Sequence, residues 1–244
     1  MIRQFGQYIF LMLKVIKRPE KGKVFRSQLL VEIDQLGIQS MGIVGIISIF
    51  MGAVVAIQTS YNLDNPLIAL SIIGFTVRQS VILEFSPTIM SLILAGKVGS
   101  RIASEIGTMR VTEQIDALEI MGINPGGFLI LPKITAAIII NPVIIIISMG
   151  LGIFGGWLVA ILTDLYTSAD YITGIRSWFE PYSIVYALIK TVVFAWLITS
   201  ISGFMGFNVK GGAIEVGAAS TKAVVWSSIM IILFNLILTQ LLLS

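Results

Sequence analysis

The chain has 244 residues, of which 56% are hydrophobic and only 12% are charged. A soluble globular domain carries about a quarter charged residues, so too few polar groups are present here to cover a water-facing surface. The absence of Cys and His excludes thiol catalysis, disulfide bonds and Cys/His zinc sites. Seven of the sixteen basic residues lie in the first 26 positions. Apolar residues are interleaved with them, which disfavours a nucleic-acid-binding arm.

The N-terminal segment carries apolar residues at helical spacing, namely Phe5, Ile9, Met12 and Ile16, with basic residues between them. This pattern is typical of a helix that lies in the headgroup layer of an anionic leaflet. We therefore predict an interfacial amphipathic helix within residues 1–32, with a disordered basic leader as the alternative. The apolar stretch at 8–13 is too short for a secretory signal and is followed by basic residues rather than a cleavage site.

The rest of the chain contains apolar blocks long enough to cross a bilayer, which takes roughly 20 helical residues. They predict an all-α membrane protein with about five spans, at 36–61, 79–106, 134–163, 184–209 and 223–244. Asn62, Asp64, Asn65 and Pro66 predict a turn after the first span, and Pro142 predicts a kink within the third. The segments 164–182 and 210–222 are predicted to be loops. Together these elements form a single predicted domain over residues 1–244.

Basic residues set the orientation of the spans. With the N-terminus in the cytoplasm, five spans place thirteen of the sixteen Lys and Arg residues on the inner side and three on the outer side. The sequence therefore predicts a cytoplasmic N-terminus and a C-terminus on the opposite side. The polar segment 107–125 is then cytoplasmic, and it is predicted to contain a short surface helix at about 112–121.

Nothing in the sequence predicts enzymatic activity. No phosphate-binding loop of the form GxxxxGKS or GxxxxGKT is present, so the chain cannot bind ATP by that route. The short cytoplasmic helix carries an acidic stripe and an apolar stripe, which suit docking to a partner but also suit an ordinary solvated helix. The acidic stripe is Glu113, Asp116 and Glu119, and the apolar stripe is Ile115, Leu118 and Met121.

Glu84 and Lys190 are charged residues at membrane depth, where ionisable groups usually mark a functional site. In one interpretation they line a cavity that accommodates a polar headgroup while apolar walls hold acyl chains. In the other, each lies at the interface in water.

Two segments resemble a known family. The run from Leu94 to Pro125, LAGKVGSRIASEIGTMRVTEQIDALEIMGINP, and the run from Lys210 to Val225, KGGAIEVGAASTKAVV, are similar to motifs of the MlaE (YrbE) family. These proteins are permease subunits of MCE-associated ABC lipid transporters. The order of elements is similar along nearly the whole chain, and the EQIDAL string at 113–118 is the most specific part of the likeness.

The resemblance implies a permease that moves phospholipid between the inner membrane and periplasmic components and works with several partners. They are a second copy of itself, a cytoplasmic ABC ATPase dimer and a periplasmic MCE-domain protein, with no nucleic acid. It further implies a multi-pass protein of the cell inner membrane with a periplasmic C-terminus. The chain itself would hold no cofactor, because the ATPase would bind ATP and magnesium.

The resemblance also implies roles for particular residues. The coupling helix to the ATPase would use Glu113, Gln114, Ile115, Asp116, Leu118, Glu119 and Met121. The lipid cavity, near the first and second spans, would use Glu84, Lys190, Leu83, Phe85, Ile57, Leu63 and Leu67. Two positions depart from the family pattern: Leu83 stands where many relatives carry Arg, and Asn235 where many carry Asp. The first departure weakens the transfer of headgroup contacts from the family.

Two other functions remain open at this point. One is a proton- or ion-coupled secondary transporter that uses Glu84 as its titrating group, although no inverted repeat is evident. The other is a membrane scaffold that only anchors partners.

Overall fold

Helices account for the secondary structure of the computed structural model, which describes residues 2–17, 22–63 and 69–243. In a bilayer core every backbone N–H and C=O must be bonded within the chain, and a helix achieves this for an isolated apolar segment. Among the described residues, five helices are long and apolar enough to cross a membrane: Gly22–Tyr61, Ser71–Val111, Gly126–Leu162, Tyr182–Phe207 and Ala213–Leu242. The predicted all-α membrane fold is therefore confirmed, whereas the orientation of the termini stays a prediction.

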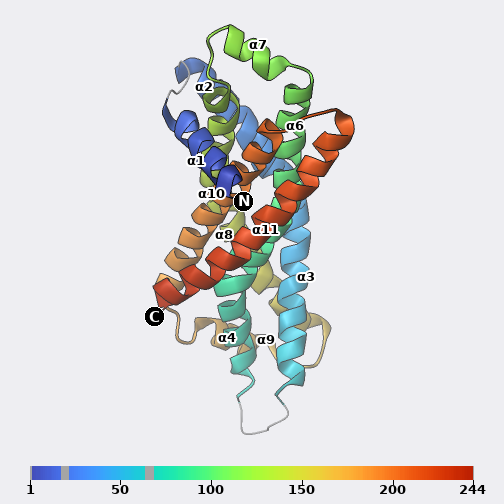
Figure 1. Cartoon of the computed structure of the whole chain (residues 1–244). Helices are drawn as coiled ribbons and strands as arrows, with labels where there is room; N and C mark the ends of the chain where they lie inside the picture. The colour runs from blue at the N-terminus through green and yellow to red at the C-terminus, as the bar shows by residue number, and fades with distance from the viewer. Residues whose placement is uncertain (1, 18–21, 64–68, 244) are drawn as a thin grey trace. The chain divides into compact units, whose positions relative to one another are not determined.

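The N-terminal region consists of two helices, α1 (Ile2–Lys17) and α2 (Gly22–Ile33), shown in Figure 1. The single interfacial helix predicted over 1–32 is thus divided. Its second half continues through the π-helical segment η1 (Asp34–Ile38) into α3 (Gln39–Tyr61). Asn62 follows α3 in a hydrogen-bonded turn, while Asp64, Asn65 and Pro66 of the predicted turn lie outside the described residues.

The second spanning helix is longer than the predicted 79–106. It comprises α4 (Ser71–Ser80), η2 (Val81–Ile89), α5 (Met90–Leu94), η3 (Ala95–Gly99) and α6 (Ser100–Val111). The charges Arg78, Glu84 and Lys97 all lie within it, and each has a partner. These charges concealed the length of the helix in the sequence, because an unpaired charge would end a span.

The remaining helices are α7 (Gln114–Ile120), η4 (Gly126–Ile130), α8 (Leu131–Leu162), α9 (Ser168–Arg176), α10 (Tyr182–Phe207) and α11 (Ala213–Leu243). Two loop predictions were wrong. The segment 164–182 contains α9, and most of the segment 210–222 belongs to α11, which begins at Ala213 rather than near 223. Thr167 caps α9 by accepting a hydrogen bond from the backbone N–H of Asp170 at 3.1 Å. Helix α8 continues through Pro142.

The chain divides into two compact units. Unit 1 comprises Met1–Ser40, Ser91–Asn141 and Val192–Ser244, and unit 2 comprises Met41–Met90 and Pro142–Thr191. Helices α3, α5, α8 and α10 contribute residues to both.

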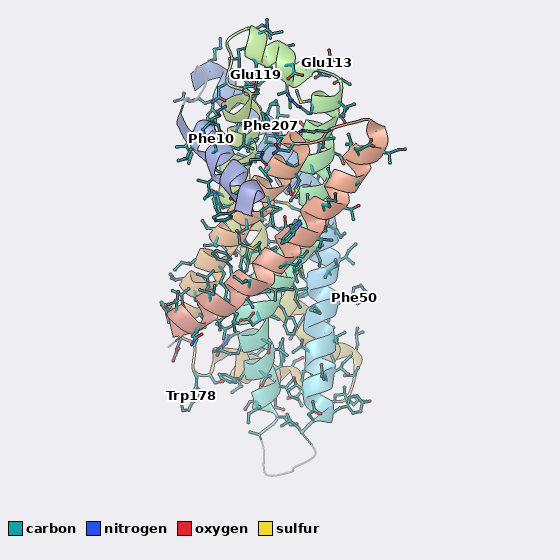
Figure 2. The ribbon with its side chains drawn as sticks, viewed as in Figure 1. Phe10, Phe50, Glu113, Glu119, Trp178 and Phe207 are labelled. Carbon is teal, nitrogen blue, oxygen red and sulfur yellow. The ribbon has the colours of Figure 1, made fainter. Side chains whose placement is uncertain are left out.

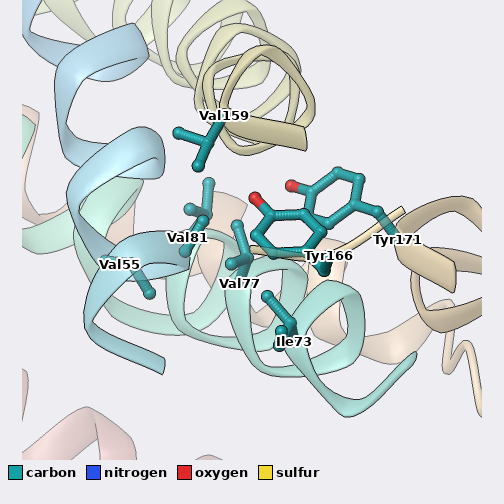
Figure 3. Packing of buried hydrophobic residues seen from close by; sticks show 8 residues of the cluster. Val55, Ile73, Val77, Val81, Val159, Tyr166 and Tyr171 are labelled. Carbon is teal, nitrogen blue, oxygen red and sulfur yellow. The ribbon is translucent and has the colours of Figure 1, made fainter. Parts of the chain in front are cut away.

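Unit 2 is built on close helix approach. A Cβ on Gly52 of α3 would overlap the main-chain carbonyl of Gly152 on α8, and a Cβ on Gly174 of α9 would overlap that of Ser71 on α4. Small residues at such crossings let membrane helices pack backbone to backbone. Figure 3 shows the adjoining core, in which the rings of Tyr166 and Tyr171 lie beside a group of buried aliphatic side chains. Burial raises the pKa of Tyr166 to about 12, so this phenol stays neutral.

Candidate functional site

Glu84 and Lys190 form an ion pair inside unit 2. Lys190 Nζ lies 2.8 Å from Glu84 Oε1 and 4.4 Å from the centroid of the Tyr186 ring. The two partners differ sharply in environment, because the Lys190 side chain is fully buried whereas 42% of the Glu84 side chain is exposed. The interpretation that Lys190 lies at the interface in water is therefore wrong. The buried Lys190 ammonium binds the Glu84 carboxylate, and of the two side chains only that of Glu84 reaches the surface of the chain.

Two hydroxyl groups also bond to Glu84. Thr88 Oγ1 donates to Glu84 Oε2 at 3.0 Å, and the Tyr186 hydroxyl donates to Glu84 Oε1 at 3.4 Å. A buried ammonium is strongly destabilising unless it is paired and hydrogen-bonded, and this cluster meets that requirement. The arrangement presents an anionic hydrogen-bond acceptor between the apolar side chains of Leu83 and Phe85.

Glu84 sits in η2, a π-helical stretch that contains Pro87. Pro87 has no N–H to donate, so the regular i→i−4 hydrogen-bond pattern cannot pass through it. Short π-helical segments occur frequently at functional sites, because the wider turn re-aims the side chains that it carries. Buried serines hold the segment in place: Ser148 Oγ donates to Ser86 Oγ at 3.1 Å, and Ser48 Oγ donates to Ser148 Oγ at 2.8 Å.

The other predicted lipid-binding residues that the structure describes also belong to unit 2. Leu83 and Phe85 flank Glu84 and are partly buried. Ile57, Leu63 and Phe85 are partly buried and pack against the core cluster of Figure 3, so each contributes to the packing of unit 2 besides its predicted contact with lipid. Leu67 lies outside the described residues.

Helix α7 is the predicted cytoplasmic surface helix, and it is shorter than the expected 112–121. Glu113 joins it to α6 in the left-handed conformation, with φ of 60°. At its other end the N–H of Gly122, with φ of 75°, bonds to Glu119 O, and the N–H of Ile123 bonds to Leu118 O. This pair of bonds is a Schellman motif, which terminates a helix sharply. Both ends of α7 are thus defined by backbone geometry, and Figure 2 shows Glu113 and Glu119 on this projecting element.

The exposed surface of α7 differs from the predicted stripes. Ile115 is fully buried and anchors α7 to unit 1, whereas Ile120 is 88% exposed and Met121 is 64% exposed. Asp116 is paired within the chain, because its Oδ1 lies 2.5 Å from Arg110 Nη1. Glu113, Gln114 and Glu119 are exposed, and Leu118 is partly buried. The exposed surface of α7 and its two ends therefore includes Glu113, Gln114, Ala117, Glu119, Ile120 and Met121.

The sequence did not reveal a second buried charge cluster, in unit 1. Lys133 Nζ donates to Glu32 Oε1 at 2.5 Å and to both carboxylate oxygens of Glu105 at 2.9 Å. Lys133 is 3% exposed, and the cluster joins α8, α2 and α6. Its residues lie 28 and 101 positions apart in sequence, so no local pattern could have indicated it.

Arg78 was placed on the outer side by the sequence, but its role was not recognised. It is 2% exposed and donates to the main-chain carbonyls of Ile175 at 2.5 Å, Ser177 at 2.7 Å and Trp178 at 3.2 Å. These carbonyls lie at and beyond the C-terminal end of α9, where a helix leaves acceptors unpaired. Arg78 therefore fastens α9 to α4.

Comparison with known proteins identifies relatives along nearly the full length of the chain. The sequence profile of the family described as Permease MlaE matches residues 29–241. A probable ABC transporter permease protein of Rickettsia prowazekii is 37% identical over 97% of this chain and 90% of its own length. The intermembrane phospholipid transport system permease protein MlaE of Haemophilus influenzae is 32% identical over 92% of this chain and 86% of its own length. The chloroplastic protein TRIGALACTOSYLDIACYLGLYCEROL 1 of Arabidopsis thaliana is 31% identical over 93% of this chain and 65% of its own length.

The five spanning helices and these relatives define the class of protein as a multi-pass membrane permease subunit of an ABC transporter. Such a subunit transports rather than catalyses a reaction. The chain belongs to the MlaE permease family.

Proposed function

We propose that this permease moves phospholipid between the inner membrane and periplasmic MCE and outer-membrane components, driven by a separate ATPase. The observation that carries the proposal is the half-exposed Glu84 carboxylate backed by the fully buried Lys190. Such a carboxylate can accept hydrogen bonds from the ammonium or hydroxyl groups of a lipid headgroup, while neighbouring apolar residues contact acyl chains. The named activity of the Haemophilus influenzae relative supports this choice of substrate.

Energy would reach the chain through α7. A coupling element must transmit force, so it has to be rigid and attached firmly to its own chain. Buried Ile115 and the Arg110–Asp116 ion pair supply the attachment, and the two defined helix ends supply the rigidity. Ile120 and Met121 then offer exposed apolar contacts, and Glu113 and Glu119 offer charges that orient the partner.

The remaining partners follow from the same proposal. A cytoplasmic ABC ATPase dimer binds ATP and magnesium and closes against two copies of α7, one from each of two permease chains. Closure biases an open–closed equilibrium of the lipid cavity. A periplasmic MCE-domain protein exchanges lipid on the other side, and the N-terminus faces the cytoplasm in accordance with the distribution of basic residues.

Substitution of Glu84 by alanine should lower the amount of phospholipid that co-purifies with the protein about tenfold, because a hydrogen bond to a charged group contributes roughly 1.5 kcal/mol. Mass spectrometry of lipids recovered from native membranes measures this. Glu180→Ala is the matched control, since Glu180 is an exposed unit-2 carboxylate that contacts no residue of the Glu84 cluster in the described contacts.

Lys190→Met tests the same site through the buried partner of Glu84, because it removes the cation that holds the Glu84 carboxylate in position. We expect altered lipid recovery from this variant too. Unchanged lipid amount and composition in both Glu84→Ala and Lys190→Met would contradict a headgroup site at Glu84. Nucleotide-independent transport accompanied by proton uptake in liposomes would instead support the ion-coupled alternative.

Substitution of Ile120 by aspartate should abolish co-purification of the ATPase while leaving the permease folded. Ile120 is 88% exposed, so a charge there disturbs no internal packing but places a carboxylate in the proposed apolar contact. Nucleotide hydrolysis in the eluate of a tagged permease measures the effect. Ile214→Asp is the control, because Ile214 is 86% exposed but lies outside α7. Full ATPase recovery with Ile120→Asp and with Met121→Asp would overturn the coupling assignment.

A further inference from the structure

Unit 1 contains a large groove that none of the residues discussed so far explains. Its volume is about 1050 Å³, and α1, α10 and α11 form its walls. Most of its lining is aliphatic or aromatic. The side chains that define this apolar part are Ile201, Phe204, Met205, Trp226, Met230 and Phe234.

One part of the groove is cationic. Lys210 and Lys222 both line it and are exposed, one just before the start of α11 and the other in its first turns. Glu215 also lines it and carries one negative charge, and the Gly212 N–H donates to Glu215 Oε2 at 2.8 Å. Two lysines against one carboxylate leave this part of the groove with a positive balance. The groove therefore combines an apolar slot with two lysine side chains.

The α1 wall of the groove is fixed rather than loosely apposed. The Tyr8 hydroxyl lies 2.8 Å from the fully buried Ser200 Oγ, and the Tyr8 ring meets the Phe204 ring edge to face with centroids 5.6 Å apart. Burial raises the pKa of Tyr8, so the phenol stays neutral and keeps this bond. An amphipathic helix is thus held along one side of an open apolar slot.

A phospholipid matches this combination of features. Lys side chains next to a membrane attract anionic headgroups, and Trp and Tyr favour the depth at which headgroups meet acyl chains. The lining includes Tyr8, Trp196 and Trp226. A second copy of the chain is a poorer occupant of this groove, because it would bring the same lysines and leave the cationic part without a counter-charge.

We propose that this groove binds one anionic phospholipid, with the headgroup at Lys210 and Lys222 and an acyl chain along Phe204, Trp226 and Phe234. This lipid fastens α1 against α10 and α11 from the leaflet in which α1 lies. The inference does not rest on the proposed transport function, because it uses unit-1 residues only, whereas Glu84 and Lys190 belong to unit 2. Either can fail while the other stands.

Tryptophan quenching by brominated lipid tests the site directly. The chain has four Trp residues. Trp157→Phe together with Trp178→Phe leaves Trp196 and Trp226, both in the groove. The protein is reconstituted in phosphatidylcholine vesicles that contain equal mole fractions of either brominated phosphatidylglycerol or brominated phosphatidylcholine. We expect the anionic lipid to quench preferentially, with roughly a fivefold preference contributed by each lysine.

The dependence of this preference on charge is tested with Lys210→Gln combined with Lys222→Gln. Removal of the two positive charges should make the two brominated lipids quench equally. Lys23→Gln combined with Arg26→Gln is the matched control, because both residues are exposed in α2, the charge change is the same and neither lines the groove. This control should keep the preference. Equal quenching by both lipids in the parent protein, or a preference that survives the Lys210 and Lys222 substitutions, would overturn the proposal. Absence of quenching by either lipid, as expected if a second copy covers the groove, would overturn it as well.

Discussion

Replacement of Lys133 by methionine should destabilise the protein by about 3 kcal/mol or more, because breaking a buried ion pair leaves an uncompensated charge. Lys133 is 3% exposed, and its ammonium contacts both Glu32 and Glu105. Methionine fills a similar volume but offers no counter-charge to the carboxylates. Glu32 is the more severely affected partner, because its side chain is 12% exposed whereas that of Glu105 is 41% exposed.

Thermal unfolding in detergent measures this loss as a fall in Tm of about 6 °C or more for a chain of this size. Lys23→Met is the control, since Lys23 is exposed and should shift Tm little. Adding Glu32→Gln to Lys133→Met should restore part of the lost stability, because it removes the more buried unpaired charge. An unchanged Tm in Lys133→Met, or no recovery in the double variant, would contradict the electrostatic explanation.

The Lys133 cluster also links α7 to the rest of unit 1. The cluster joins α2 and α8 to α6, and α6 leads directly into α7 through Glu113. A displacement of α7 by a partner would therefore act on three helices of unit 1 together. Buried charges are costly unless they are paired, so this cluster favours the arrangement of the three helices that brings its charges together.

Replacement of Arg78 by methionine should release α9 from α4. Arg78 donates to three main-chain carbonyls at and beyond the end of α9, and its guanidinium lies 5.1 Å from the Phe75 ring and 5.6 Å from the Phe179 ring. Hydrogen bonds to charged groups contribute about 1.5 to 3 kcal/mol each, and unsatisfied buried carbonyls add a desolvation penalty. We expect a loss of at least about 3 kcal/mol, concentrated in unit 2.

Limited chymotrypsin digestion measures this release locally, because Trp178 and Phe179 are exposed aromatic residues next to the bonded carbonyls. Arg78→Met should accelerate cleavage there and lower Tm. Arg176→Met is the matched control, as Arg176 is an exposed arginine on α9 itself. Cleavage of Arg78→Met at the rate of the control would show that the close packing of Gly174 against Ser71 holds α9 on α4 without the Arg78 hydrogen bonds.

Much of the fold was predictable because a bilayer imposes a length on apolar segments. The third and fourth spans, predicted at 134–163 and 184–209, end within two residues of α8 and α10 at their C-terminal ends. The start of α11 was missed by ten residues, since the segment from Ala213 to Lys222 is rich in small and polar residues, and Ile214 and Val216 are too few to extend an apolar block. The helix forms there because α11 packs against α6, which is a tertiary contact.

The candidate site, too, was predictable from the sequence only in part. Glu84 and Lys190 stood out in the sequence as charges at membrane depth, but only the structure shows that they pair and that one partner is buried. On α7 the periodicity indicated an apolar stripe correctly in kind, but Ile115 faces inward and Ile120 faces outward. A helix of seven residues is too short for periodicity alone to indicate which side faces the protein.

The sequence by itself determined the membrane class, the number of spans, the family and the short polar helix between the second and third spans. These depend on composition, block length and local motifs, all of which are properties of neighbouring residues. The tertiary structure alone decided which charges meet: Lys133 with Glu32 and Glu105, Lys190 with Glu84, and Arg78 with the end of α9. Those contacts join residues up to 106 positions apart, and they form because a buried charge in an apolar medium must find a partner wherever the folded helices bring one within reach.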